Sequence, residues 1–494
     1  MKRRIENYHL FILCLLLFVA SSLSAQSIKG SDKADALSSY NVVWDKPGEN
    51  SLGSMPAGNG DIGINAWVVT NGDLLFYLSK TDTWSGNGRL LKLGSIRVSI
   101  SPNPFTNGEP FLQTLVLKDG AIHIKAGEKG KEVNIGLWVD ANHPVIDMDI
   151  KSRQPVKVTI RFETWRTERR AITTQAEKGS AYGIDDLPVI YVEKDSILET
   201  TKNELVWLHQ NKYSIWKNNL QLQALDEWAE KHEDPLLNRI FGGAVRSRQM
   251  VKINSQTMET KQPETVVQAQ VYALTQKNST IDQWEQSLLK IIQNTEAINE
   301  NKREAAHKQW WEQFWNRSYI YIKSPGTASE DSIDQVNSGY ILQRYMNASA
   351  GRGSFPIKFN GSIFTVDTKN IKGNESGFDA DFRRWGGAYW WQNTRLIYWP
   401  MLMAGDFDLM HPFFNMYFKA LPLRKVATRK YYHHDGAFYP ETMYFWGTYL
   451  DVNYGRDRKD KPDGLTDNEY IRRYWQGGLE MSMMMLDYYA FTGN

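Results

Sequence analysis

The hydrophobic period of the sequence changes once, near Thr280, and this change constrains the fold more than any other feature. Between about residues 40 and 275, short apolar runs alternate with polar residues, as in half-buried strands. Residues 115–125 read LVLKDGAIHIK, and the Asp119-Gly120 pair between two alternating segments predicts a β-hairpin. Residues 156–164 and 265–275 predict two further strands. Many strands separated by turns predict a β-sandwich over residues 26–278, with a helix-containing insertion within residues 205–245.

Beyond Thr280 the apolar residues recur with helical spacing. Thr280 and Gln283 fit a capping box, in which each side chain bonds the other residue's backbone N–H. We therefore expect linker helices over residues 279–324. Several later segments space their apolar residues as amphipathic helices, so we expect a mostly α domain over residues 325–494. The predicted fold class is multidomain α and β.

The first 25 residues have the layout of a secretory signal peptide. Basic residues at positions 2–4 precede an apolar run over residues 10–20, and small residues follow up to Ala25. The apolar run is well short of the roughly 20 residues that a membrane-spanning helix needs. We therefore expect residues 1–25 to be removed and the protein to be secreted or periplasmic, with no membrane contact after cleavage.

Removal of this segment would change what the chain can bind. It takes away Cys14, the sole cysteine, and lowers the formal charge from +2 to zero. A neutral chain argues against nucleic acid or an anionic membrane surface as a general partner. The 18 Trp and 24 Tyr residues suit an oligosaccharide or polysaccharide partner, because flat rings cover the apolar faces of pyranosides. The sequence shows no phosphate-binding glycine loop and no His/Cys ligand cluster, so we expect no cofactor and no metal. It leaves the oligomeric state open.

Two motifs near the start resemble a known glycosidase family. Residues 54–67 read SMPAGNGDIGINAW, and residues 78–98 read LSKTDTWSGNGRLLKLGSIRV. They resemble the opening strands of the inverting α-L-fucosidase family, which belongs to the six-hairpin (α/α)6-barrel glycoside hydrolase superfamily. The positions that match are Pro56, Gly58, Asn59, Gly60, Gly63, Trp84, Ser85 and Gly86.

The resemblance implies a fold, and it also implies that this chain holds only part of that fold. It implies an N-terminal β-super-sandwich, linker helices and an (α/α)6 toroid of twelve helices. At ordinary helix and loop lengths, residues 325–494 accommodate about half of these helices. We therefore expect an incomplete toroid, truncated at the C-terminus. The resemblance then places the general acid and base beyond Asn494, so that this chain lacks them.

A third motif lies at residues 386–400, GGAYWWQNTRLIYWP. It is similar to the fucosidase motif Asn-x-Asn-x-x-x-x-Tyr-Trp-Pro, whose last three residues match residues 398–400. The second family asparagine falls on Asn393 and the first falls on Trp391. In that family both asparagines hold the attacking water, so the resemblance implies this role for Asn393.

A fourth motif, at residues 436–447, contains a carboxylate. Maltose phosphorylase-type enzymes of the same superfamily carry Asp-Thr-Glu where this sequence has residues 393–395, Asn-Thr-Arg. Their Tyr-Pro-Trp-Glu element is similar to residues 436–447, GAFYPETMYFWG, with the carboxylate shifted by one position to Glu441. The sequence therefore resembles both families and matches neither motif completely.

These features predict an exported glycoside hydrolase that cleaves a glycosidic bond of a fucoside-like or related glycan by inversion. Inversion needs a protonated carboxyl and a second carboxylate roughly 6.5–9.5 Å away. The candidate catalytic residues are Asn393 and Glu441. The candidate substrate-binding residues are Asp381, Trp385, Trp390, Trp391 and Arg395.

Structural roles remain open for each candidate. The tryptophans could be the core of a packed helix, and Glu441 could stabilise a helix N-terminus. Asp379 and Asp381 could form ion pairs with Arg383 or Arg384, and Glu480 needs a partner if it is buried. The alternative function is a non-catalytic carbohydrate-binding or degenerate six-hairpin protein. A phosphorylase is a third possibility.

Overall fold

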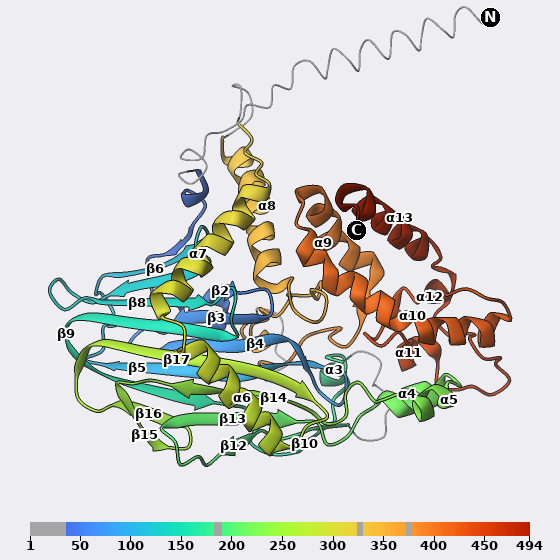
Figure 1. Cartoon of the computed structure of the whole chain (residues 1–494), viewed down its shortest axis with the longest axis horizontal. Coiled ribbons are helices and arrows are strands. Elements are labelled where there is room, and N and C mark those ends of the chain that lie inside the picture. The colour runs from blue at the N-terminus through green and yellow to red at the C-terminus, as the bar shows by residue number, and fades with distance from the viewer. Residues whose placement is uncertain (1–35, 182–189, 324–329, 372–377) are drawn as a thin grey trace, which may run out of the picture. The chain divides into compact units, whose positions relative to one another are not determined.

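The computed structural model describes residues 36–181, 190–323, 330–371 and 378–494, and residues 41–494 form one compact unit (Figure 1). The signal-peptide prediction for residues 1–25 lies outside the described residues. Among the described helices, none combines the length and the apolar character that crossing a bilayer requires.

Fifteen of the described strands form one antiparallel network that folds into two layers. The first layer has the order β1 (Val42–Trp44), β6 (Phe111–Val116), β7 (Ala121–Ala126), β8 (Val133–Val139), β9 (Val145–Glu163), β17 (Glu264–Lys277), β14 (Arg239–Arg246), β13 (Glu204–Gln210) and β12 (Ser196–Leu198). The second contains β2 (Met55–Gly58), β3 (Ile62–Val68), β4 (Leu74–Trp84), β5 (Leu90–Ser101), the end of β9, β16 (Thr257–Thr260) and β15 (Met250–Asn254). The predicted hairpin is confirmed, because Val116 pairs with Ala121.

The long strand β9 joins the two layers. Its first part pairs with β8 and β17, and its last part pairs with β5 and β16. The layers face each other, since β2 lies against β7 and β8, and β5 lies against β14. Between them Phe162 stacks on Trp207 with ring centroids 4.0 Å apart. The hydrophobic period of two predicted a large antiparallel β region, and the structure contains it.

Two helices follow the β region and lie against its first layer. Helix α6 (Ile281–Glu296) begins with the predicted capping box, and its apolar face packs on β14 and β17. Helix α7 (Glu300–Arg317) is fixed by Arg303, which donates to both Asp147 oxygens at 2.7 Å. Gly120 adopts φ +59°, and a Cβ there would lie 2.1 Å from the Trp311 ring of α7, so the turn requires glycine.

Short elements interrupt the strands. The predicted helical insertion consists of α4 (Trp216–Leu222) and α5 (Asp226–Lys231), between β13 and β14. Strands β10 (Arg170–Ile172) and β11 (Ile190–Val192) form a separate pair, and α3 (Gln175–Lys178) follows β10. The described residues also include the 3-10 turns η1 (Ser51–Gly53), η2 (Thr368–Asn370) and η3 (Phe407–Met410).

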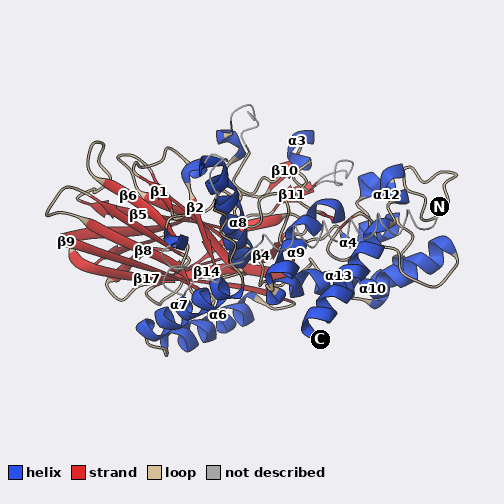
Figure 2. Cartoon of the chain, turned by 90° about the horizontal axis from the view of Figure 1, so that it is seen from above, coloured by secondary structure: helices blue, strands red, loops and turns tan. Residues whose placement is uncertain are grey.

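The C-terminal part is mainly helical, as expected. It contains α8 (Glu330–Ala350), α9 (Trp391–Ala404), α10 (His411–Tyr432), α11 (Asp451–Tyr454), α12 (Glu469–Arg473) and α13 (Gln476–Thr492), with the short strands β18 (Tyr389–Trp390) and β19 (Thr442–Met443). Helices α9, α10 and α13 gather together (Figures 1 and 2). Tyr398 of α9 stacks on Phe413 of α10 at 4.1 Å.

The glycine-rich turn of the first sequence motif connects the β region to α8. The backbone N–H of Gly60 donates to the carbonyl of Ser349 at 3.0 Å, and the N–H of Arg352 donates to the carbonyl of Gly60 at 2.8 Å. Tyr345 of α8 also donates through its hydroxyl to the carbonyl of Pro56 at 2.9 Å. The motif that carried the resemblance is therefore a docking turn for the helix.

Candidate functional site

A two-residue ladder places Glu441 at the start of helix α9. Strand β18 pairs with β19, with Trp390 opposite Thr442. The backbone N–H of Trp391 then donates to the carbonyl of Glu441 at 2.7 Å. The residue before the helix, Trp390, supplies no side-chain cap. Instead the N–H of Gln392 donates to Oε1 of Glu441 at 3.1 Å, so a distant carboxylate caps the helix.

The carboxyl of Glu441 is buried, and burial raises its pKa. Hydrogen bonds from the Thr442 hydroxyl and from the N–H of Gln392 oppose the shift but do not cancel it. No ion pair to Glu441 is present in the described part of the chain. Glu441 therefore holds its proton to a higher pH than an exposed glutamate does.

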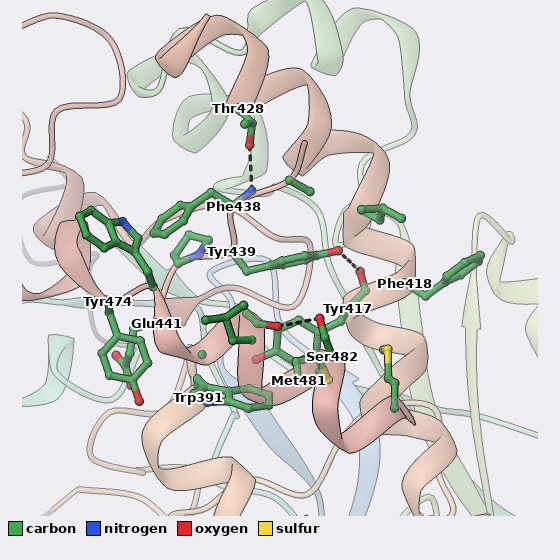
Figure 3. A pocket seen from close by; sticks show the side chains of 18 of the residues that line it. Trp391, Tyr417, Phe418, Thr428, Phe438, Tyr439, Glu441, Tyr474, Met481 and Ser482 are labelled. Carbon is green, nitrogen blue, oxygen red and sulfur yellow. Dashed lines mark hydrogen bonds between the residues drawn. The ribbon is translucent and has the colours of Figure 1, made fainter. Parts of the chain in front are cut away.

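Glu441 lines a cavity of about 830 Å³ between α10, the segment after it, and α13. Figure 3 shows the rings of Trp391, Tyr417, Tyr439 and Tyr474 gathered near the carboxyl from separate segments. Tyr439 is fixed by its hydroxyl, which donates to the carbonyl of Tyr417 at 2.9 Å. The remaining lining residues are Phe418, Leu421, Thr428, Tyr432, His434, Ala437, Phe438, Pro440, Trp475, Gly477, Gly478, Leu479, Met481, Ser482 and Met485.

The lining of this cavity combines aromatic rings, hydroxyl groups and one carboxyl group. Rings dominate its walls and can cover apolar sugar faces, while hydroxyls of Ser482, Thr428 and the tyrosines lie among them. Among the described lining residues, Glu441 is the only carboxyl group. The site can therefore donate one proton from a dry position beside a ring-lined space.

A second glutamate joins α13 to α9. Glu480 accepts hydrogen bonds from Trp391 Nε1 at 3.1 Å, Arg395 Nη1 at 2.8 Å and Trp399 Nε1 at 2.8 Å. The three donors lie four residues apart and so share one face of α9. These hydrogen bonds and the Arg395 charge lower the pKa of Glu480 despite its partial burial. Glu480 does not line the cavity, and Arg395, predicted to bind substrate, also lies outside the lining and forms this ion pair.

The structure places Asp381, also predicted to bind substrate, in a buried contact between the helical part and the β region. Its Oδ1 accepts from the N–H of Lys92 at 2.8 Å. Its Oδ2 accepts from Trp165 Nε1 at 2.7 Å and from Arg166 Nη1 at 2.6 Å. With both oxygens occupied and the side chain 1% exposed, Asp381 offers no acceptor to a sugar.

The predicted arginine partners of the two aspartates were wrong. Asp381 pairs with Arg166, and Asp379 pairs with Arg170 at 2.9 Å. Arg383 instead donates to the backbone carbonyl of Asn360 at 2.8 Å. The sequence named the ion pair as an alternative but could not name a partner more than 200 positions away.

The other candidates divide between the cavity and its surroundings. Trp391 lines the cavity and is buried. Trp385 and Trp390 lie together outside it, with ring centroids 6.2 Å apart, and Trp385 is 39% exposed. Asn393 is half-buried on α9 and does not line the cavity. The structure therefore brings Glu441 and Trp391 together and leaves the others outside.

Sequence reasoning missed the rings that complete the site. Tyr417, Tyr439 and Tyr474 lie on α10, before β19 and before α13, and the sequence offered only their type as a signal. His434, which follows directly after α10 and His433, also lines the cavity. Within the described ranges, no group of three or more His, Cys, Asp or Glu residues is arranged to hold a metal ion.

Comparison with known proteins gave a family match and distant structural likenesses. Residues 43–320 match the model of a family described as "Domain of unknown function (DUF5703)". No curated protein matches the chain.

Three solved structures are similar in part. The first is a protein from the human microbiome described as a kojibiose phosphorylase, with 11% identity and a TM-score of 0.47 over 83% of this chain and 52% of that one. The second is a bacterial glucoamylase complexed with acarbose, with 10% identity and a TM-score of 0.34 over 83% and 56%. The third is ccman5, a glycosyl hydrolase of family GH92, with 10% identity and a TM-score of 0.33 over 69% and 44%. The chain thus spans about half the length of the first two, and all three names are those of carbohydrate-active enzymes.

Proposed function

The chain belongs to the family described as Domain of unknown function (DUF5703), and we propose that it is a carbohydrate-active protein that binds a glycan in the cavity beside Glu441 and cleaves a glycosidic bond there. The observation that carries the proposal is a buried carboxyl with a raised pKa on the wall of a ring-lined cavity. Such a carboxyl is suited to protonate a leaving glycosidic oxygen, because it keeps its proton to a higher pH than an exposed glutamate does.

Each part of the cavity has a role in this proposal. The rings of Trp391, Tyr439 and Tyr474 cover the apolar faces of the sugar, and Glu441 is the proton donor. The cap that Glu441 forms on α9 holds its carboxyl in place through the N–H of Gln392. Glu480 acts indirectly, because it fixes the indole of Trp391 through Nε1.

The finer assignments rest on the resemblance of the motifs. It supports an inverting reaction on a fucoside-like or related glycan, and it supports helices α8, α9, α10 and α13 as part of an (α/α)6 toroid. Inversion uses a second carboxylate in addition to the proton donor. The anomer released from a cleaved substrate, followed by proton NMR, tests inversion directly.

A panel of fucosides, arabinosides and galactosides tests the function. We expect at least one to bind in the cavity and to be hydrolysed, and we expect Glu441→Gln to slow hydrolysis by about 10² to 10⁴ without weakening binding by more than a few-fold. Equal turnover by the wild type and Glu441→Gln would place the acid elsewhere. Absence of both binding and turnover across the panel would overturn the proposal.

One observation favours a second candidate, a carbohydrate-binding protein without hydrolysis. Among the described residues that line the cavity there is one carboxyl group, whereas inversion uses two. This candidate predicts saturable binding of a glycan with no product formed. The same panel separates the two candidates, because binding is measured by calorimetry and turnover by release of reducing sugar.

We also propose that the protein is exported and that residues 1–25 are a signal peptide. The basic, apolar and small-residue segments of the N-terminus support this. N-terminal sequencing of the protein recovered from a periplasmic or culture fraction tests it, with Gln26 expected as the first residue. An intact N-terminus in the cytosolic fraction would contradict it.

A further inference from the structure

A second cavity, of about 440 Å³, lies between the helical insertion of the β region and helix α10. It is separate from the Glu441 cavity and shares no lining residue with it. Its walls come from α4 and α5, the ends of β14 and β17, the segment after α8, and α10 with residues 445–446. A cavity built by several distant segments is the usual setting of a small-molecule site.

Fixed aromatic rings form much of this second cavity. Trp228 and His232 of the insertion stack with centroids 3.5 Å apart and an interplanar angle of 9°. His232 Nδ1 also lies 3.0 Å from the carbonyl of Trp228, which holds the pair in place. Trp446 is oriented by Nε1, which donates to Oδ1 of Asn219 at 3.2 Å. Trp216 and Phe355 complete the rings.

The cavity carries an excess of positive charge. Lys277 is balanced by Glu233, at 3.2 Å. Lys419 is exposed and forms no ion pair within the described part of the chain. Arg239 is 8% exposed and donates to two backbone carbonyls, of Asp82 at 3.0 Å and Pro235 at 2.9 Å, while its buried Nε has no hydrogen-bond partner among the described residues. Lys419 therefore lines the cavity without a carboxylate of its wall to balance it, and the nearest carboxylate to act on Arg239, Asp82, lies behind the wall and is itself paired with Lys80.

We propose that this second cavity binds an acidic sugar, one that carries a carboxylate on its ring. The rings suit the apolar face of a pyranoside, and Lys419 and Arg239 suit its anionic group. The Glu233 carboxylate, 77% exposed at the rim, can accept hydrogen bonds from sugar hydroxyls. A simple inorganic anion would use the cations but neither the rings nor Glu233. The proposal does not depend on the role of Glu441.

Calorimetric titration of the whole protein with trigalacturonate tests this site against two other probes, neutral maltotriose and inorganic phosphate. We expect trigalacturonate to bind. Its binding should weaken as the salt concentration is raised, because the charged groups that attract it are partly exposed to solvent. We expect maltotriose to bind at least about tenfold more weakly, which corresponds to about 1.4 kcal/mol. Equal affinity for maltotriose, or equal affinity for phosphate, overturns the proposal.

Two pairs of variants locate the binding. Lys419→Ala is expected to weaken trigalacturonate binding about fivefold, whereas Lys425→Ala, an exposed lysine on the same helix outside both cavities, leaves it unchanged. Trp228→Ala is expected to weaken it about tenfold, whereas Trp44→Ala, which alters an exposed tryptophan of β1 outside both cavities, leaves it unchanged. Binding that is equally strong in Lys419→Ala and Lys425→Ala overturns the site. Lys419 is exposed, so its variant decides the question even if Trp228→Ala fails to fold.

Discussion

The backbone N–H of Gln392 donates to Oε1 of Glu441 at 3.1 Å, although 49 positions separate the two residues. This bond gives one carboxyl group two tasks, because it caps α9 and faces a ring-lined cavity. The two interpretations that the sequence left open for Glu441, a helix N-terminal carboxylate and a site residue, are therefore not exclusive. The hydrogen bond positions the group, while burial keeps it protonated to a higher pH.

Glu441→Gln is expected to lower kcat by about 10² to 10⁴, the range typical of a lost general acid. The amide retains the shape of the side chain and an oxygen for the N–H of Gln392, so the fold is expected to survive. Steady-state kinetics on any substrate found with the glycoside panel measures this effect. As a control, Glu312→Gln changes an exposed glutamate on α7 and should leave kcat unchanged. Comparable losses in both variants would contradict a specific role.

The pH dependence of stability offers a second test at Glu441. Burial raises its pKa above the ordinary 4.5, so the folded state binds this proton more tightly than the unfolded state. The stabilisation is complete below pH 4.5 and is lost as the pH rises through the folded pKa. The Glu441→Gln variant has no such proton to lose, so this loss of stability does not occur in it. Urea unfolding from pH 4 to 7 should therefore show the variant gaining stability relative to the wild type, and a constant difference would argue against the raised pKa.

Glu480→Gln is expected to destabilise the protein by about 1–3 kcal/mol at pH 7, because a charged acceptor of three hydrogen bonds is replaced. The pKa of Glu480 is lowered, so its contribution is present above pH 4.5 and disappears as the pH falls through the folded pKa. The difference between wild type and variant should therefore shrink at low pH. Urea midpoints at pH 7 and pH 3 measure it.

Asp381→Asn is expected to cost about 3–5 kcal/mol of stability, because it removes one of the two carboxylates that pair with the buried Arg166. Asp45→Asn, which alters an exposed aspartate, serves as the control and should change little. Because Asp381 lies away from the cavity, glycan affinity of the folded Asp381→Asn protein should equal that of the wild type. A loss of affinity without a loss of stability would instead support the substrate-binding role predicted from sequence.

Lys92 provides a test in which the stability of the protein should rise with pH. The residue is 3% exposed, its buried amine has no hydrogen-bond partner among the described residues, and burial lowers its pKa to about 7. The unfolded chain keeps this proton up to the ordinary pKa of 10.5, so stability should rise by about 1.4 kcal/mol per pH unit between pH 7 and 10. Lys92→Met should abolish this rise and be more stable than the wild type at pH 7. Unfolding at several pH values measures both, with Lys425→Met as the exposed control.

Local features of the fold were predictable from neighbouring residues. The Asp119-Gly120 hairpin, the Thr280 capping box and the helical insertion all depend on side chains a few positions apart. The start of α9 was not predictable from its neighbours, because no residue just before Trp391 can cap the helix. Its cap comes from Glu441, which a two-residue ladder brings near.

The sequence by itself determined the division into a β region and a later helical region, because hydrophobic period, turn residues and caps act over a few positions. Through their motifs it also singled out Glu441 and Trp391, which line one cavity. Only the tertiary structure decided that Asp381 and Arg395 are engaged by Arg166 and Glu480, 215 and 85 positions away. Such pairings are set by which surfaces pack together, and a charged side chain in a sequence carries no record of the partner that burial will give it.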